Sequence, residues 1–314
     1  MTRSEAAATA AHRPTQLSAL PRYERPHEDL GDATPTNPCT HVAPSEIDAV
    51  IAASPLSDGA KDLLRGLLRL GGTRLFPGGG LGIEYGSLLK TAARPEYIAR
   101  HVAEAAAHLQ QRQVDLLLVP GMSGYPVGAM YSVVAGIPAV LLKKATLAGD
   151  GQETYPAGAF IIPSYTGEGD VVMHADPAAV QDMVESIVAP QLAAQRDAER
   201  PRLTLRAAGA DDIIDKATMS RAVCESAVVI GQSSIATFLA RYRAETGDRR
   251  QIETEVKVVA WVTPLIKGYN QPQEHIQRSF DILPFAGINV TSVHHDPPAL
   301  GIEGVGILPF TGAN

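Results

Sequence analysis

Two adjacent aspartates, Asp211 and Asp212, are the side chains most suited to chemistry in this chain of 314 residues. They end an apolar stretch and come just before Asp215–Ser220, a turn that leads into a helix. Neighbouring carboxylates repel each other, so a cation or solvent must compensate them. We expect the pair to hold Mg²⁺-bound ribose hydroxyls, and the turn to offer backbone N–H groups to a phosphate. An acidic turn that caps a solvated helix end is the alternative interpretation.

A second candidate site is the loop Gly121–Gly124. It follows the apolar run Val114–Val119, which is typical of a buried parallel strand, and precedes a small-residue helix at about Val127–Ala135. Ligands of open α/β sheets lie at the carboxyl ends of the strands, where helix N-termini favour anions. The spacing therefore predicts that an anion binds at this loop.

Basic residues end the next strand. Lys143 and Lys144 directly follow the apolar run Ala139–Leu142. Either lysine could supply a cation to a negatively charged leaving group, although a solvated strand end would look the same. The polar, glycine-containing segment Thr146–Gly158 that follows is suited to a mobile loop.

These residues must be positioned by alternating strands and helices, which predicts an α/β fold with a central parallel sheet and flanking helices. We expect residues 1–44 to be largely disordered and residues 45–314 to form one domain. Phe76–Leu89 is expected to be a turn or hairpin. Further strands are expected at Ala159–Ile162, Val171–His174, Leu203–Ala208, Val256–Val262 and Ile288–Val293, and helices at Ser45–Ala53, Ser57–Leu70, Pro95–Gln111, Ala178–Arg196, Arg221–Val229 and Ile235–Thr246.

Composition narrows the function classes. The 27 basic and 34 acidic residues give a formal charge of −7, which argues against a nucleic-acid partner. The 2 cysteines make no disulfide framework. We find no apolar run long enough to cross a membrane and no apolar signal core at the N-terminus, so we expect a cytoplasmic protein without a membrane partner.

Taken in order, the loop, the two lysines, the mobile segment and the acidic pair before its turn resemble the type I phosphoribosyltransferases. The resemblance spans about Phe76 to Val293. It implies a Rossmann-like fold with a core at about 95–263 and a small hood from about 45–90 and 264–314. It also implies that the substrate phosphoribosyl pyrophosphate (PRPP) is bound by the two loops and Lys143, namely by Gly121, Met122, Ser123, Gly124, Lys143, Asp215, Lys216, Ala217, Thr218, Met219 and Ser220.

The resemblance is nearest to the purine branch, in particular to xanthine phosphoribosyltransferase, while the stretch Tyr85–Ala145 is similar to the orotate branch. Pro163–Thr166 resembles the S-[FY]-T stretch beside the mobile loop of that family. Pro264–Tyr269 resembles its lysine-plus-aromatic acceptor site. The implied acceptor-binding residues are Ser164, Tyr165, Thr166, Lys267 and Tyr269. A packing tyrosine with a strand-end lysine, and a simple serine–threonine turn, explain the same residues without a ligand.

The implied activity is a Mg²⁺-dependent transfer of the 5-phosphoribosyl group of PRPP to a nitrogen of a purine-like or other heterocyclic acceptor, with release of pyrophosphate. Asp211, Asp212 and Lys144 would be catalytic, both aspartates would serve the metal, and a homodimer is expected. A non-catalytic PRPP or nucleotide sensor on the same scaffold is the alternative, and an unrelated doubly wound nucleotide binder is a third interpretation.

The chain departs from the family in two places. The family turn usually carries a glycine, which Asp215–Ser220 lacks. Because Ala217 does not easily adopt a positive φ, we expect this turn to have a different shape. The helix Ala178–Arg196 looks like an insertion. Both departures indicate a divergent member with an unusual acceptor.

Overall fold

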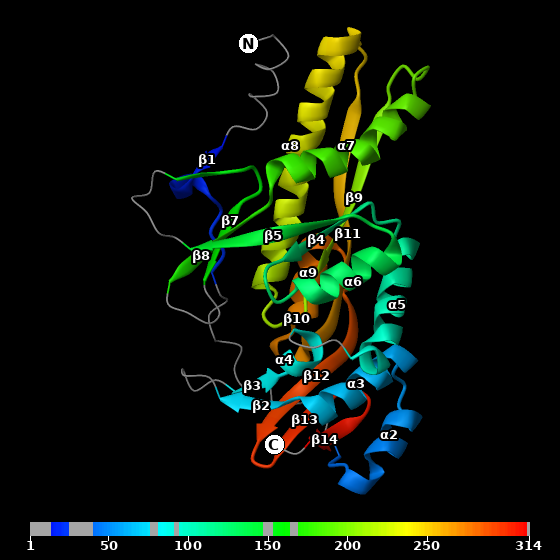
Figure 1. Cartoon of the computed structure of the whole chain (residues 1–314), viewed down its shortest axis with the longest axis vertical. Coiled ribbons are helices and arrows are strands. Elements are labelled where there is room, and N and C mark those ends of the chain that lie inside the picture. The colour runs from blue at the N-terminus through cyan, green and yellow to red at the C-terminus, as the bar shows by residue number, and fades with distance from the viewer. Residues whose placement is uncertain are drawn as a thin grey trace.

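The computed structural model describes residues 14–24, 40–75, 81–90, 94–146, 153–163 and 169–312. One 10-stranded mixed sheet crosses the molecule (Figure 1), in the order β14-β13-β12-β11-β9-β4-β5-β8-β7 with β10 beside β11. Its strands are β4 (Leu116–Pro120), β5 (Ala139–Thr146), β7 (Phe160–Pro163), β8 (Asp170–His174), β9 (Arg202–Ala210), β10 (Ile213–Ile214), β11 (Glu253–Lys267), β12 (Phe285–His295), β13 (Pro298–Ile302) and β14 (Gly306–Pro309).

The predicted α/β class with a central parallel sheet is confirmed. Strands β12, β11, β9, β4 and β5 pair in parallel. All five residues of β4 are buried, as expected for a strand covered on both faces. The sheet edges differ from the expectation, because β8 pairs antiparallel with β5 and β7, and β13 pairs antiparallel with β12 and β14.

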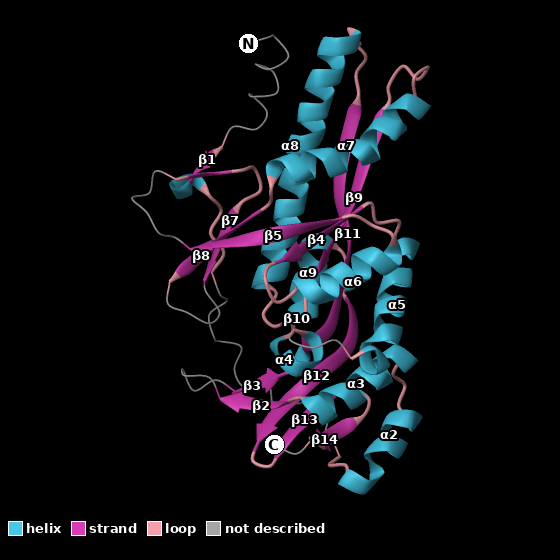
Figure 2. Cartoon of the chain, viewed as in Figure 1, coloured by secondary structure: helices cyan, strands magenta, loops and turns pink. Residues whose placement is uncertain are grey.

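Helices cover both faces of the sheet (Figure 2). Helices α3, α5 and α6 contribute to one core cluster with the β4 residues Leu117 and Val119. Helices α7 and α8 contribute to a second core cluster, which contains Leu116 and Leu118 of β4. The helices are α2 (Ile47–Ala53), α3 (Asp58–Leu70), α4 (Gly86–Leu89), α5 (Pro95–Gln111), α6 (Tyr125–Ala135), α7 (Pro177–Ala194), α8 (Thr218–Thr246) and α9 (Pro272–Phe280), with short 3₁₀ turns η1 (Leu17–Ala19), η2 (Pro44–Glu46) and η3 (Gly268–Asn270).

The two helices expected between Arg221 and Thr246 are one continuous helix, α8, of 29 residues. Gly231, which lies between the two expected helices, lets α8 approach the sheet: a Cβ there would lie 2.8 Å from the Leu205 side chain on β9. By length and hydropathy α8 could cross a membrane, but 67% of its most apolar window is buried inside the structure. The apolar side chains of α8 are explained by its packing against β9, β11 and α7.

Strand β11 is longer than expected. It was predicted to end at Val262, yet it continues through Pro264 to Lys267. Proline has no N–H to donate, and the pairing with β12 passes over Pro264, from Thr263 with Ala286 to Leu265 with Ile288. The extension carries Lys267 to the carboxyl edge of the sheet.

The predicted hairpin near Phe76–Leu89 is present, since β2 (Gly72–Leu75) and β3 (Leu81–Glu84) pair antiparallel. Part of the segment 1–44, expected to be disordered, is ordered: β1 (Thr15–Gln16) pairs with β6 (Thr154–Tyr155). The pairing also fixes the end of the predicted mobile loop, whose residues 147–152 lie outside the described part. The division into hood and core stays a prediction.

Gly209, on β9 two residues before the acidic pair, lies directly against the buried ring of Trp261, and a Cβ at this position would overlap that ring. We predict that Gly209→Ala lowers the free energy of unfolding by about 2 kcal/mol, because a packed ring cannot move aside without strain. Urea denaturation would measure the loss.

The matched control is Gly86→Ala, where the new methyl group would meet only the flexible Glu84 carboxylate. Its stability should remain within about 0.5 kcal/mol of the wild type. Equal stability of the two variants would contradict the packing assigned to Trp261.

Candidate functional site

The acidic pair lies at the carboxyl end of β9, in the two-residue gap before β10. Asp211 and Asp212 have exposed fractions of only 8% and 1%. The backbone N–H of Asp212 donates to Asp211 Oδ1 at 2.9 Å, and the backbone N–H of Asp211 donates to the carbonyl oxygen of Val262 at 3.3 Å. The alternative of an acidic turn capping a solvated helix end is wrong, because the pair is buried and α8 begins only at Thr218.

Residues from the segment after β3 compensate Asp212, and the sequence did not identify them. The Tyr85 hydroxyl donates to Asp212 Oδ2 at 3.0 Å. The Lys90 ammonium lies 3.2 Å from the same oxygen and 4.5 Å from the centre of the Tyr85 ring. The cation required by the pair is therefore Lys90, at the C-terminal end of α4.

Burial and mutual repulsion change the protonation of the acidic pair. Burial, and then the charge of Asp212, raise the pKa of Asp211 well above its ordinary value. Burial also raises the pKa of Tyr131, on α6, and the charge of Asp212 adds to this increase. A positive group that approached Asp211 would favour its ionised form.

The loop Gly121–Gly124 lies against the acidic pair, because β4 and β9 are parallel neighbours whose carboxyl ends meet at one edge of the sheet. A Cβ at Gly124 would lie 2.7 Å from Asp211 Oδ1. The Tyr125 hydroxyl, at the start of α6, donates to the Leu142 carbonyl oxygen at 2.6 Å and so ties the loop to β5. The peptide bond between Gly121 and Met122 is cis. Two loops that are distant in the sequence thus form one site.

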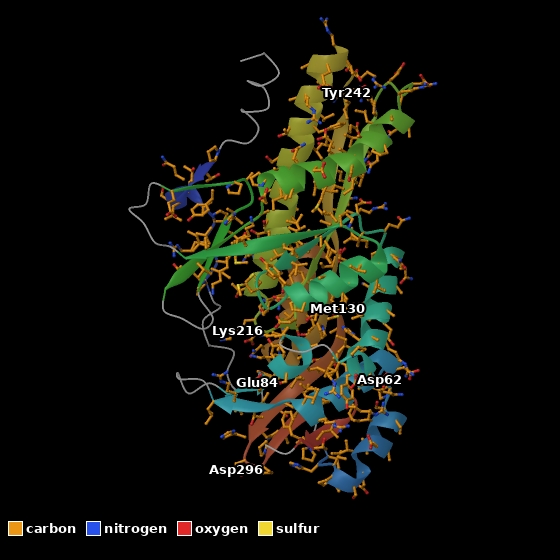
Figure 3. The ribbon with its side chains drawn as sticks, viewed as in Figure 1. Asp62, Glu84, Met130, Lys216, Tyr242 and Asp296 are labelled. Atoms are coloured by element: carbon orange, nitrogen blue, oxygen red, sulfur yellow. The ribbon has the colours of Figure 1, made fainter. Side chains whose placement is uncertain are left out.

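The turn Asp215–Ser220 has the shape that the missing glycine seemed to rule out. Ala217 has φ +60° and ψ 0°, the left-handed conformation, directly before the first residue of α8. The expectation that an alanine would change the turn is wrong, since Ala217 adopts the conformation that a glycine would favour. The Thr218 hydroxyl is buried without a hydrogen-bond partner among the described residues. Figure 3 labels Lys216 in this turn.

Lys267 is not a solvated strand-end residue. Its exposed fraction is 6%, and its ammonium lies 2.8 Å from Asp215 Oδ2. The Asn270 side-chain amide donates to the other oxygen of Asp215 at 2.5 Å. Tyr269, in η3, packs against the core cluster that contains α3, α5 and α6. The turn and the predicted acceptor residues are therefore joined through Asp215.

The other predicted residues are more loosely connected to the site. Lys143 is exposed and lies 3.4 Å from Asp176, which caps α7 through its side chain. Lys144 is exposed on β5. Neither lysine contacts the acidic pair, so a catalytic role for Lys144 stays a prediction. Ser164, Tyr165 and Thr166 lie outside the described residues.

A buried polar pair lies close to the acidic pair. His101 Nε2, on α5, and the Tyr131 hydroxyl are joined by a 2.8 Å hydrogen bond, and the His101 ring stacks on Phe285 at 6.0 Å. His101 has an exposed fraction of 1%, and burial lowers its pKa to about 4. His101 is therefore neutral at ordinary pH and adds no positive charge near the aspartates.

No protein-family model matches the chain, and no curated protein matches it. Solved structures similar to it include adenine phosphoribosyltransferase from Giardia lamblia complexed with 9-deazaadenine, with 11% identity over 76% of this chain and 99% of that chain and a TM-score of 0.45. Adenine phosphoribosyltransferase from Saccharomyces cerevisiae has 12% identity over 73% of this chain and 98% of that chain, with a TM-score of 0.44. Orotate phosphoribosyltransferase from Aeropyrum pernix has 14% identity over 73% of this chain and 92% of that chain, with a TM-score of 0.35.

These structures carry the name of the family that the sequence resembles. At such identities and scores they identify neither the activity nor the substrate of this chain, which must be inferred from its own residues.

The stability of the buried site should depend on pH through His101. Its pKa is about 4 in the folded chain against an ordinary 6.5. As the pH falls between these values, the unfolded chain takes up a proton that folded His101 does not. Stability present above pH 6.5 is thus lost towards pH 4, by up to about 3 kcal/mol. Urea denaturation at the two ends of this range would measure the loss.

In the variant His101→Gln the contribution of this histidine should disappear, so the loss of stability between pH 6.5 and pH 4 should be smaller than in the wild type. His295→Gln, which removes an exposed histidine, should keep the wild-type dependence. The same loss in wild type and His101→Gln would show that His101 is not the group responsible.

Proposed function

We propose that the protein is a Mg²⁺-dependent phosphoribosyltransferase that transfers the 5-phosphoribosyl group of PRPP to a nitrogen of a heterocyclic acceptor and releases pyrophosphate. The observation that carries the proposal is the contact between the loop Gly121–Gly124 and the buried pair Asp211–Asp212 at the carboxyl edge of the sheet. An anion-binding loop beside two carboxylates suits a ligand with a negative leaving group and neutral sugar hydroxyls.

The chain's own residues would act on the two ends of the ribose. The loop offers backbone N–H groups to the pyrophosphate, and Gly124 lets the loop lie directly against Asp211. The carboxylates accept hydrogen bonds from the ribose hydroxyls and stabilise the positive charge that grows on the ring as the bond to pyrophosphate breaks. The turn Asp215–Ser220 binds the 5′-phosphate at the N-terminus of α8.

The acidic pair is chemically suited to Mg²⁺. Among the described residues no group of three or more histidine, cysteine or acidic side chains could hold a metal, and only the two aspartates are available here. This matches an ion that keeps its waters and takes one or two carboxylates together with substrate oxygens. Because Gly124 has no side chain, the loop backbone lies directly against Asp211 Oδ1, so a metal at the acidic pair would lie next to the loop. When bound, the ion would neutralise the negative charge on the leaving group.

The acceptor would bind next to the turn. The Lys267 ammonium and Asp215 Oδ2 lie 2.8 Å apart, near the half-buried Tyr269. Towards a ligand, the ammonium would donate hydrogen bonds and the carboxylate would accept them. A heterocycle with a carbonyl group beside a ring N–H, such as an oxopurine, offers the matching acceptor and donor. We therefore propose a purine-like acceptor of this kind.

We also propose that the enzyme acts as a homodimer in the cytoplasm. Exposed apolar side chains support self-association: Met122 in the loop is 74% exposed, and Val133 and Val134 on α6 are 80% and 52% exposed. The alternative of a non-catalytic sensor rested on the missing glycine in the turn. The left-handed conformation of Ala217 supports the catalytic proposal, because the turn reaches without a glycine the conformation that a glycine would favour.

The proposal is tested with purified protein, PRPP, Mg²⁺ and a panel of oxopurines and other heterocycles, with pyrophosphate release as the readout. We predict that Asp212→Asn lowers the rate about a hundredfold or more, because the amide lacks the charge that stabilises the sugar cation. Asp48→Asn is the control, since the Asp48 side chain is 90% exposed on α2.

Full activity of Asp212→Asn would remove the acidic pair from the mechanism. If calorimetry showed no binding of PRPP with Mg²⁺ to the wild type, the proposed function itself would be wrong.

A further inference from the structure

The carboxylate assigned to the metal is already bound to a cation of the chain. Asp212 Oδ2 receives the Tyr85 hydroxyl at 3.0 Å and lies 3.2 Å from the Lys90 ammonium. The Asp212 side chain is 2% exposed and the Lys90 side chain is 36% exposed. One oxygen atom thus meets two donors, and it has little room for a further ligand.

The two partners differ in how easily they can leave. The helix that precedes Lys90 is anchored, because Leu88 and Leu89 of α4 are 0% and 2% exposed. The lysine side chain, by contrast, is partly exposed, so it can rotate into the solvent without moving α4. The ammonium already lies over the Tyr85 ring, 4.5 Å from its centre, so this contact does not depend on Asp212.

We propose that Lys90 is an internal competitor of the metal at Asp212: in the free protein its ammonium occupies the carboxylate, and binding of Mg²⁺ with the substrate displaces it from the carboxylate towards the solvent. The inference rests on the proposed function, because it takes the metal to bind the acidic pair. It adds a regulatory role for a residue that the family resemblance did not assign.

Competition by Lys90 would affect which form of the metal binds at the acidic pair. Two buried carboxylates without a cation would repel each other. Lys90 keeps a positive charge at Asp212 until the substrate arrives. A bare metal ion must then break an ion pair to enter, whereas a metal that carries the substrate gains the contacts of both loops in return. The arrangement therefore favours the metal–substrate complex over the free ion.

The test measures Mn²⁺, a spectroscopic substitute for Mg²⁺, by electron paramagnetic resonance in the absence of PRPP and at one fixed pH. We predict that Lys90→Met binds Mn²⁺ about tenfold more tightly than the wild type, a factor that corresponds to about 1.4 kcal/mol. Lys90→Arg keeps the positive charge and should bind as the wild type does.

Lys257→Met is the matched control. It removes an exposed lysine that pairs with Glu255 at 2.7 Å on β11, outside the site, and should leave the affinity for Mn²⁺ unchanged. If Lys90→Met binds Mn²⁺ no more tightly than Lys257→Met, Lys90 does not compete with the metal and the inference is wrong.

A measurement on the unaltered chain covers the case in which Lys90→Met does not fold. Amine-selective labelling, read by mass spectrometry, should modify Lys90 faster when Mg²⁺ is present at saturating concentration, because the ammonium has left Asp212. An unchanged labelling rate would overturn the inference. Failure of the wild type to bind PRPP with Mg²⁺ in calorimetry would instead refute the proposed function, so the two failures are distinguishable.

Discussion

The burial of the Asp212 carboxylate is the constraint on which the arrangement of this protein depends. Removing a charge from water costs on the order of several kcal/mol unless hydrogen bonds and an opposite charge compensate it. The compensation comes from Tyr85 and Lys90, in a segment joined to β3, while Asp212 ends β9. The hairpin β2–β3 and the short helix α4 must therefore be held over the edge of the central sheet.

Close packing of the backbone brings the rest of the site to the same edge. Gly124 allows the loop after β4 to lie against Asp211, and Gly209 allows β9 to lie against Trp261. On the other side, Lys267 and Asn270 hold Asp215 at the end of β11. The turn Asp215–Ser220, the acidic pair and the loop Gly121–Gly124 thus lie at the ends of neighbouring strands, while the side chains of Lys143 and Lys144 remain at the surface.

The sequence predicted those features that are local. The apolar run of β4, the glycine loop after it and the acidic pair after β9 each have a pattern within a few residues, and their shared edge follows from parallel pairing. Tyr85 and Lys90 could not be predicted, because nothing near them indicates that their partner is Asp212, which lies 127 positions after Tyr85. The shape of Ala217 was missed for a different reason: intrinsic preference disfavours a positive φ, and the packing around the start of α8 overrides it.

The bond between Tyr85 and Asp212 joins residues 127 positions apart in the chain. Closing so long a loop is entropically costly, so contacts of this kind tend to form after local helices and neighbouring strands are in place. Until then both aspartates remain in water, where their charges cost nothing. A chain still emerging from the ribosome would therefore possess the glycine loop well before it possesses a compensated acidic pair, and ligand binding at the complete site would report that both halves of the fold have assembled.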